Sequence, residues 1–176
     1  MTHTILKQDR VAAKDIDSWN RSVICGSNID NGWVFLLSSK STTAGEAEVW
    51  NATWTTAGSQ ANVWMAASPE LVLTDSKYRG INPNSQDFVN TAGEVFDAFK
   101  PQAGDIITVT ADALDSSTAE AYAYVPTQAH EFMWGSTLPT GLALRYLKTT
   151  YLPSGASGST ITSGRVVAYQ FEVLSN

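Results

Sequence analysis

The chain has 176 residues, a net charge of −6 and an isoelectric point of about 4.7, with one cysteine and two histidines. Hydrophobic residues make up 43% of it, which excludes a disordered chain and suits one domain with its own core. The acidic balance argues against nucleic-acid binding, because phosphate contacts depend on clustered basic residues. The longest apolar run, Trp33 to Leu37, is far too short to cross a bilayer, so no membrane role is expected.

Residues 1–20 have the least regular pattern. They lack the apolar stretch of a signal peptide, so we expect a chain made in a cytoplasm and released by lysis or within a particle. Residues 12–16 could form one helical turn or an extended segment. Because so little of this stretch is apolar, we expect an N-terminal arm, residues 1–20, that becomes ordered on contact with a partner. Ile16 and Trp19 are its candidate interface residues.

From residue 21 onward, short apolar runs alternate with turn residues, which is typical of β-strands. Asn31-Gly32 predicts a tight turn, because this pair tolerates positive φ. Further turns are expected at residues 75–80 and 153–164, and an irregular loop at residues 81–90. The expected strands cover residues 33–38, 46–56, 62–67, 71–74, 94–100, 106–110, 119–125, 142–152 and 165–173.

No segment keeps an apolar helical period for three turns. We therefore predict an all-β fold: a single-domain antiparallel barrel or sandwich over residues 21–176, preceded by the extended N-terminal arm. In its last strand, Val167, Tyr169, Phe171 and Val173 share one face.

Four of the six tryptophans fall between residues 33 and 64. Trp33 lies in a run that is apolar on both faces and is expected in the core. Trp50 and Trp54 share a predicted strand face with Glu46 and Glu48, which places that face partly in solvent. Packing between sheets, a protein interface and stacking on a sugar ring all remain open for these two side chains. We take Trp50 and Trp54 as interface candidates.

Residues that carry chemistry are few and scattered. His3 and His130 are far apart in sequence, and the Asp15-x-Asp17 pair lacks the glycine and closing glutamate of a calcium loop. No Gly-x-Ser-x-Gly motif is present, and Cys25 is interpreted as a small buried hydrophobic residue. Paired carboxylates could still serve a small hydrolase, although most acidic residues occupy outward strand positions. We expect no catalytic residue, no metal and no cofactor.

Two segments carry a resemblance to a known class. The first runs from Asn31 to Gly80 and begins NGWVFLLSSKSTTAGEAEVWNATW; the second, GEVFDAFKPQAGDIITVTADAL, spans residues 93–114. Together they resemble small virion proteins of tailed bacteriophages, the auxiliary or decoration proteins of capsid shells. The resemblance implies a β-rich fold, a homo-oligomer (often a trimer), an N-terminal arm that engages the shell, and no catalytic residues.

These observations favour a non-enzymatic virion structural protein, a capsid decoration or cement protein on the exterior of a phage head. Its expected partner is the major capsid protein, and it is expected to be a homo-oligomer, with a trimer favoured. An acidic chain suits the outside of the shell, because packaged DNA repels it inside. The alternative is a carbohydrate-binding module, displayed on a virion for host attachment. A small hydrolase is the third hypothesis.

Overall fold

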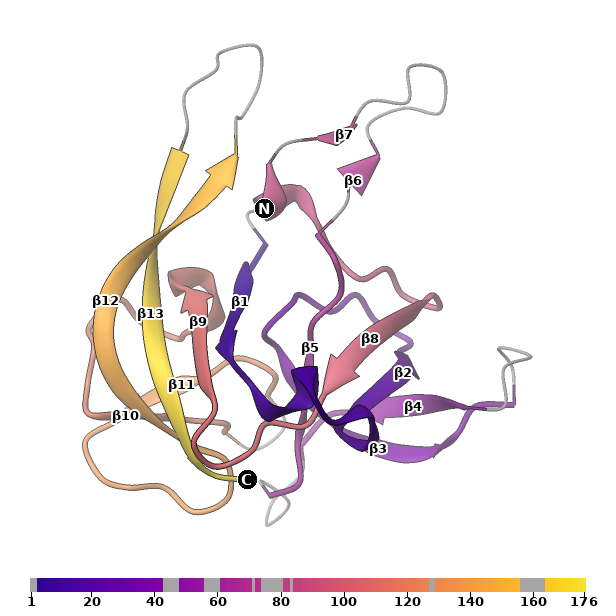
Figure 1. Cartoon of the computed structure of the whole chain (residues 1–176), viewed down its shortest axis with the longest axis horizontal. Helices are drawn as coiled ribbons and strands as arrows, with labels where there is room; N and C mark the ends of the chain where they lie inside the picture. Colours follow the sequence, from indigo (N-terminus) through magenta and orange to yellow (C-terminus); the bar gives the residue numbers. More distant parts are fainter. Residues whose placement is uncertain are drawn as a thin grey trace.

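The computed structural model describes residues 3–42, 48–55, 61–70, 72–73, 81–82, 84–126, 129–155 and 164–176. Every regular element in these ranges is a β-strand or a single turn of 3-10 helix, so the predicted all-β class is confirmed. Figure 1 shows a sheet that carries a long hairpin on one side of the molecule and a small barrel on the other.

The larger sheet has six strands, and every neighbouring pair in it is antiparallel. In spatial order the strands are β1 (Leu6–Arg10), β9 (Ile106–Thr110), β13 (Gly164–Ser175), β12 (Ala143–Gly155), β10 (Tyr122–Tyr124) and β11 (Met133–Gly135). Strands β12 and β13 pair along their whole length, from Ala143 with Ser175 to Gly155 with Gly164. They form the hairpin expected from the sequence, and the middle of its loop, residues 156–163, lies outside the described residues.

Five strands close into a barrel beside this sheet. Around the barrel they are β2 (Asn20–Ile24), β4 (Val49–Thr53), β3 (Val34–Lys40), β5 (Trp64–Ala66) and β8 (Val95–Phe99). The β2–β4 pair is parallel, which departs from the purely antiparallel expectation, and the other pairs are antiparallel. A separate two-stranded ribbon joins β6 (Val72–Leu73) to β7 (Ile81–Asn82), so a short strand begins where a loop was expected.

One hydrophobic core joins the barrel to the sheet. Val34, Met65 and Phe99 from the barrel are buried in the same cluster as Ile107 and Phe171 from the sheet. A second cluster fills the barrel itself, where Phe35 and Phe96 meet edge to face with ring centroids 5.7 Å apart. Because barrel and sheet share buried side chains, they belong to one folded unit.

The segment expected as an N-terminal arm is built into the sheet. Strand β1 pairs with β9, with Leu6 opposite Val109. Ile5 and Val11, which flank β1, are each only 6% exposed. The structure therefore differs from the expected arm over residues 3–20, because β1 is a strand of the sheet and Ile5 and Val11 are buried against the rest of the chain.

Short 3-10 turns complete the chain. They are η1 (Ala12–Lys14), η2 (Asp17–Trp19), η3 (Ser85–Asp87) and η4 (Ala111–Ala113). The predicted turn at Asn31-Gly32 is present: Trp33 N donates to Asp30 O, and Gly32 has a φ of +88°. A Cβ atom at Gly32 would also meet Val109 Cγ1 at 3.3 Å, so both conformation and space favour glycine here. The turn expected at residues 75–80 lies outside the described residues.

Candidate interaction surfaces

Trp54, a predicted interface residue, takes part in an aromatic stack. His130 lies against two indoles, with its ring centroid 3.7 Å from that of Trp33 and 4.8 Å from that of Trp54. Both tryptophans are half-buried and pack against the core of the barrel. Thr55, which follows, donates its Oγ1 proton to the carbonyl oxygens of Pro126 and Ala129. This stack therefore holds the segment before β11 against the barrel.

Trp50 has different surroundings. It lies on β4 opposite Lys40 of β3, and the Lys40 ammonium is 5.8 Å from the Trp50 ring centroid. The same ammonium pairs with the Glu48 carboxylate at 3.0 Å. The Trp50 Nε1 atom is buried and has no hydrogen-bond partner among the described residues. Lysine thus covers part of this indole, and the expected shared face of Trp50 and Trp54 is not a bare aromatic platform.

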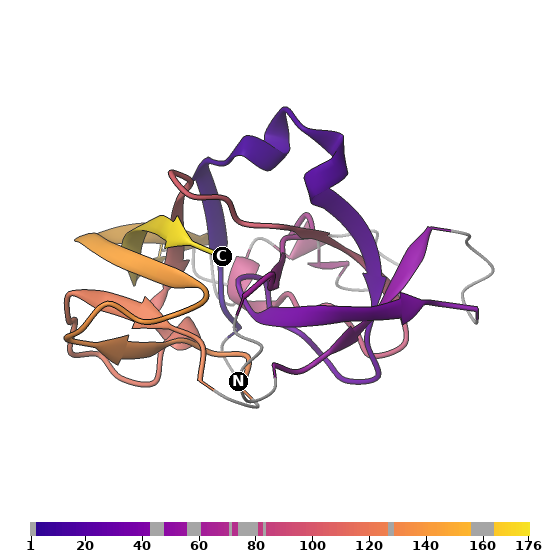
Figure 2. The same cartoon turned by 90° about the horizontal axis from the view of Figure 1, so that it is seen from below.

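The other two candidates lie where the chain passes from sheet to barrel. Residues 10–20 form an arch at one edge of the molecule (Figure 2), and Val11 and Ala13 of this arch are buried in the main core. Ile16, between η1 and η2, is 39% exposed on this arch. Trp19 is half-buried and packs against the main core, and its carbonyl accepts a hydrogen bond from Lys100 N. Of these two, Ile16 is the one free to contact a partner.

The largest exposed apolar feature of the hairpin was not among the predicted sites. Tyr151 on β12 is directly opposite Val167 on β13, and these side chains are 60% and 40% exposed. Residues two apart on a strand share a face, as do directly opposed residues. The same face therefore carries Thr149, Pro153 and Arg165, all exposed. We call these five residues the outer hairpin face.

The outer hairpin face is exposed because β12 and β13 are longer than their neighbours. Strand β10 pairs with β12 only as far as Arg145, and β9 pairs with β13 from Ala168 onward. The opposite face of the hairpin is covered, since Leu152 and Ala168 are buried with Ile5. A sequence signal for this surface existed: Val167 continues the apolar face of Phe171 beyond the length that five-residue strands can cover.

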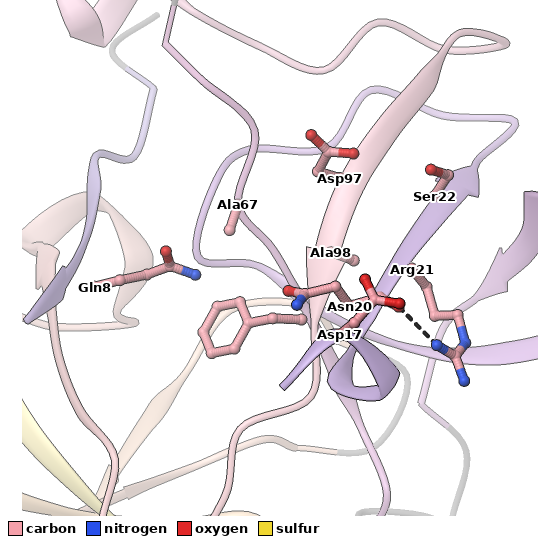
Figure 3. A pocket seen from close by; sticks show the side chains of 9 residues that line it. Gln8, Asp17, Asn20, Arg21, Ser22, Ala67, Asp97 and Ala98 are labelled. Carbon is pink, nitrogen blue, oxygen red and sulfur yellow. Dashed lines mark hydrogen bonds between the residues drawn. The ribbon is translucent and has the colours of Figure 1, made fainter. Parts of the chain in front are cut away.

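A polar groove of about 460 Å³ lies where β1 and η2 approach the barrel strands β2 and β8. Figure 3 shows Gln8 on one side of it and Asp97 and Arg21 on the other, with Asp17 and Asn20 between them. Its lining also includes the apolar side chains of Ala67, Ala98 and Phe99. A smaller hollow that shares Gln8, Ala67 and Asp97 extends the groove toward Asn31.

In this groove the arginine has contacts within the chain, and the two carboxylates do not. Arg21 donates to the Asn20 carbonyl oxygen at 2.7 Å, and its guanidinium carbon is 5.5 Å from the Trp64 ring centroid. The carboxylates of Asp17 and Asp97 have neither a hydrogen bond nor an ion pair with any described residue. The groove therefore offers two free acceptors next to an arginine that is already engaged.

The side chains of His3 and Asp30 form a polar pair near the N-terminal end of the described residues. His3 Nδ1 is 2.8 Å from Asp30 Oδ1, and the other oxygen of Asp30 accepts from Thr4 N, so this pair anchors the start of the chain. Within the described ranges, no group of three His, Cys, Asp or Glu residues could hold a metal ion. In the same ranges no helix is long and apolar enough to cross a membrane.

Comparison with known proteins gives no relative: no family model, curated protein or solved structure matches this chain. The fold and its surfaces define an all-β protein with an exposed apolar hairpin and an acidic groove. Any functional assignment therefore depends on these two surfaces and on the resemblance of residues 31–80 and 93–114.

Proposed function

We propose that this protein is a non-enzymatic virion structural protein, a decoration protein that binds the outer surface of a phage head and stabilises it. The observation that supports this most directly is the outer hairpin face. Tyr151 on this apolar strand face is 60% exposed. Such a face is typical of a surface that becomes buried when the protein binds a partner. The major capsid protein is the proposed partner, and the host cytoplasm is the proposed place of synthesis.

Charge supports the exterior of the shell as the binding site. The chain carries a net charge of −6, and the DNA packed inside a head would repel it. A decoration protein stabilises the assembled shell because it binds that shell and not the separated subunits. At a concentration 100-fold above Kd, each bound copy would stabilise the shell by about 2.7 kcal/mol.

Binding to particles tests this function. Heads of the phage that encodes the chain would be prepared without it and mixed with purified protein. We expect the protein to co-sediment with the heads and to raise the temperature at which they break open. Tyr151→Ser combined with Val167→Ser should weaken binding at least about tenfold, because two anchors of the apolar face are lost.

Leu138→Ser is the matched control, since Leu138 is also 60% exposed but lies outside the hairpin. It should bind heads as the unchanged protein does. Unchanged protein that neither co-sediments with the heads nor stabilises them would contradict the proposed function.

One observation favours carbohydrate binding as a second candidate. The polar groove contains free carboxylates and side-chain amides, which are groups that bind sugar hydroxyls. The groove, and not Trp50 with Trp54, is then the site, because Lys40 lies over Trp50 and Trp54 packs against the barrel core. Glycan-array binding that Asp97→Asn abolishes would support this candidate.

A further inference from the structure

The outer hairpin face and the polar groove carry opposite charges, Arg165 on the hairpin and Asp17 and Asp97 in the groove. We propose that the outer hairpin face of one copy docks into the polar groove of a second copy, with Arg165 paired to Asp17 and Asp97. The same face is proposed to bind the phage head, so this contact describes the protein before it binds a head, and one hairpin makes only one of the two contacts at a time.

The hairpin supplies the basic and apolar partner. Residues 132–171 contain no Asp or Glu, although the chain has 17 acidic residues in all, and they include Arg145, Lys148 and Arg165. Arg165 is exposed on the outer hairpin face, opposite Pro153, and makes no ion pair with any described residue. A guanidinium on an exposed strand face can pair with carboxylates of a second copy.

The groove supplies the acidic partner. Asp17 and Asp97 present free carboxylates, and because Ala98 and Phe99 are almost fully buried, the groove offers a docked hairpin mainly polar groups. Gln8, on the facing wall, has a side-chain amide that can donate to an acceptor on the docked hairpin. A single arginine between two carboxylates would gain charge-assisted hydrogen bonds that neither copy can form alone.

The two surfaces cannot meet within one chain. In Figure 1 the coloured ends of β12 and β13 lie on the sheet side of the molecule, while the groove lies between β1 and the barrel strands β2 and β8. Each copy therefore offers a hairpin to one neighbour and a groove to another. A head-to-tail contact of this kind gives a closed ring when its rotation closes.

Sedimentation of the purified full chain tests the contact. The unchanged protein should form a closed oligomer whose stability falls as salt is added, because an ion pair contributes to it. Arg165→Gln should weaken association at least about tenfold, and so should Asp17→Asn combined with Asp97→Asn. Lys148→Gln is the control: it removes an equal charge from the other face of the same hairpin, opposite Gln170, and should assemble normally.

Mixing the two defective variants gives the sharper result. The Arg165→Gln chain keeps its groove and the doubly changed chain keeps its hairpin, so the mixture should form a one-to-one dimer that cannot close. All three sites are exposed, and circular dichroism should confirm that each variant stays folded. A strict monomer up to about 100 µM, an equal defect in Lys148→Gln, or a mixture that stays monomeric would overturn the proposal. So would a glycan that binds the groove of a monomeric chain.

Discussion

At the scale of single residues, His130 is a side chain whose protonation opposes the folded state. It is stacked between Trp33 and Trp54, and its carbonyl accepts from Val34 N. Burial lowers its pKa, and the nearby carboxylates of Glu131 and Asp30 only partly oppose that effect. The folded chain therefore disfavours the imidazolium form.

The sign of the pH effect follows from this lowered pKa. An unfolded histidine has a pKa of about 6.5, so below that pH the unfolded chain binds more protons than the folded chain. The contribution of His130 is then complete above pH 6.5 and is lost as the pH falls toward its folded pKa. We expect the urea midpoint to fall between pH 7.5 and 5.5, and the fall to be smaller in His130→Phe. An identical fall in both proteins would contradict this assignment.

At the scale of elements, strand β1 is held by polar as well as apolar contacts. Asp9 accepts hydrogen bonds from Thr108 Oγ1 of β9 and Gln170 Nε2 of β13. Burial acts to raise the pKa of Asp9, but the hydrogen bonds from Lys7, Thr108 and Gln170 outweigh it and leave the pKa lowered. An ionised carboxylate thus joins three strands of the sheet.

Substitutions of two isoleucines test whether the N-terminal segment is part of the core or a loose arm. Ile5 is 6% exposed and packs with Leu152 and Ala168, whereas Ile16 is 39% exposed on the arch. Ile5→Ala should lower the free energy of unfolding by about 2–4 kcal/mol, because it leaves a cavity. Ile16→Ala should change it by less than about 0.5 kcal/mol. Equal and small effects in urea denaturation would favour the arm.

Regular alternation explains which strands could be predicted. The elements at 34–40, 95–99, 106–110, 143–155 and 164–175 all fall close to their expected ranges, because each presents a continuous apolar face. Strand β1 was not predicted because its own residues, Leu6–Arg10, are exposed or half-buried and show no apolar face. Strand β11 is three residues long, and its pairing with β10 decides it more than its own pattern does.

The candidate surface was harder to predict than the fold. A sequence pattern shows which residues share a face, but exposure depends on how far neighbouring strands extend. Val167 and Phe171 share one face, yet Phe171 is fully buried and Val167 is 40% exposed. Trp54 shows the opposite difference. Its predicted strand face, shared with carboxylates, was expected to be partly exposed, but its side chain packs against His130.

At the scale of the whole molecule, the shared core determines how the protein unfolds. Buried side chains from the barrel and from the six-stranded sheet belong to the same cluster, so losing either part would expose apolar surface on the other. Opening the barrel alone would therefore cost nearly as much as unfolding the chain. We expect a single cooperative transition.

Phe35→Ala tests this cooperativity. Phe35 is fully buried in the cluster inside the barrel and is not part of the shared cluster, so its removal should cost about 3–5 kcal/mol. If barrel and sheet unfold together, native-state hydrogen exchange should show this same loss in the barrel strand β8 and in the sheet strands β9 and β13. Protection that falls in β8 while staying unchanged in β9 and β13 would instead show two independently stable parts. The hairpin would then be carried by a sheet that can stay folded without its barrel.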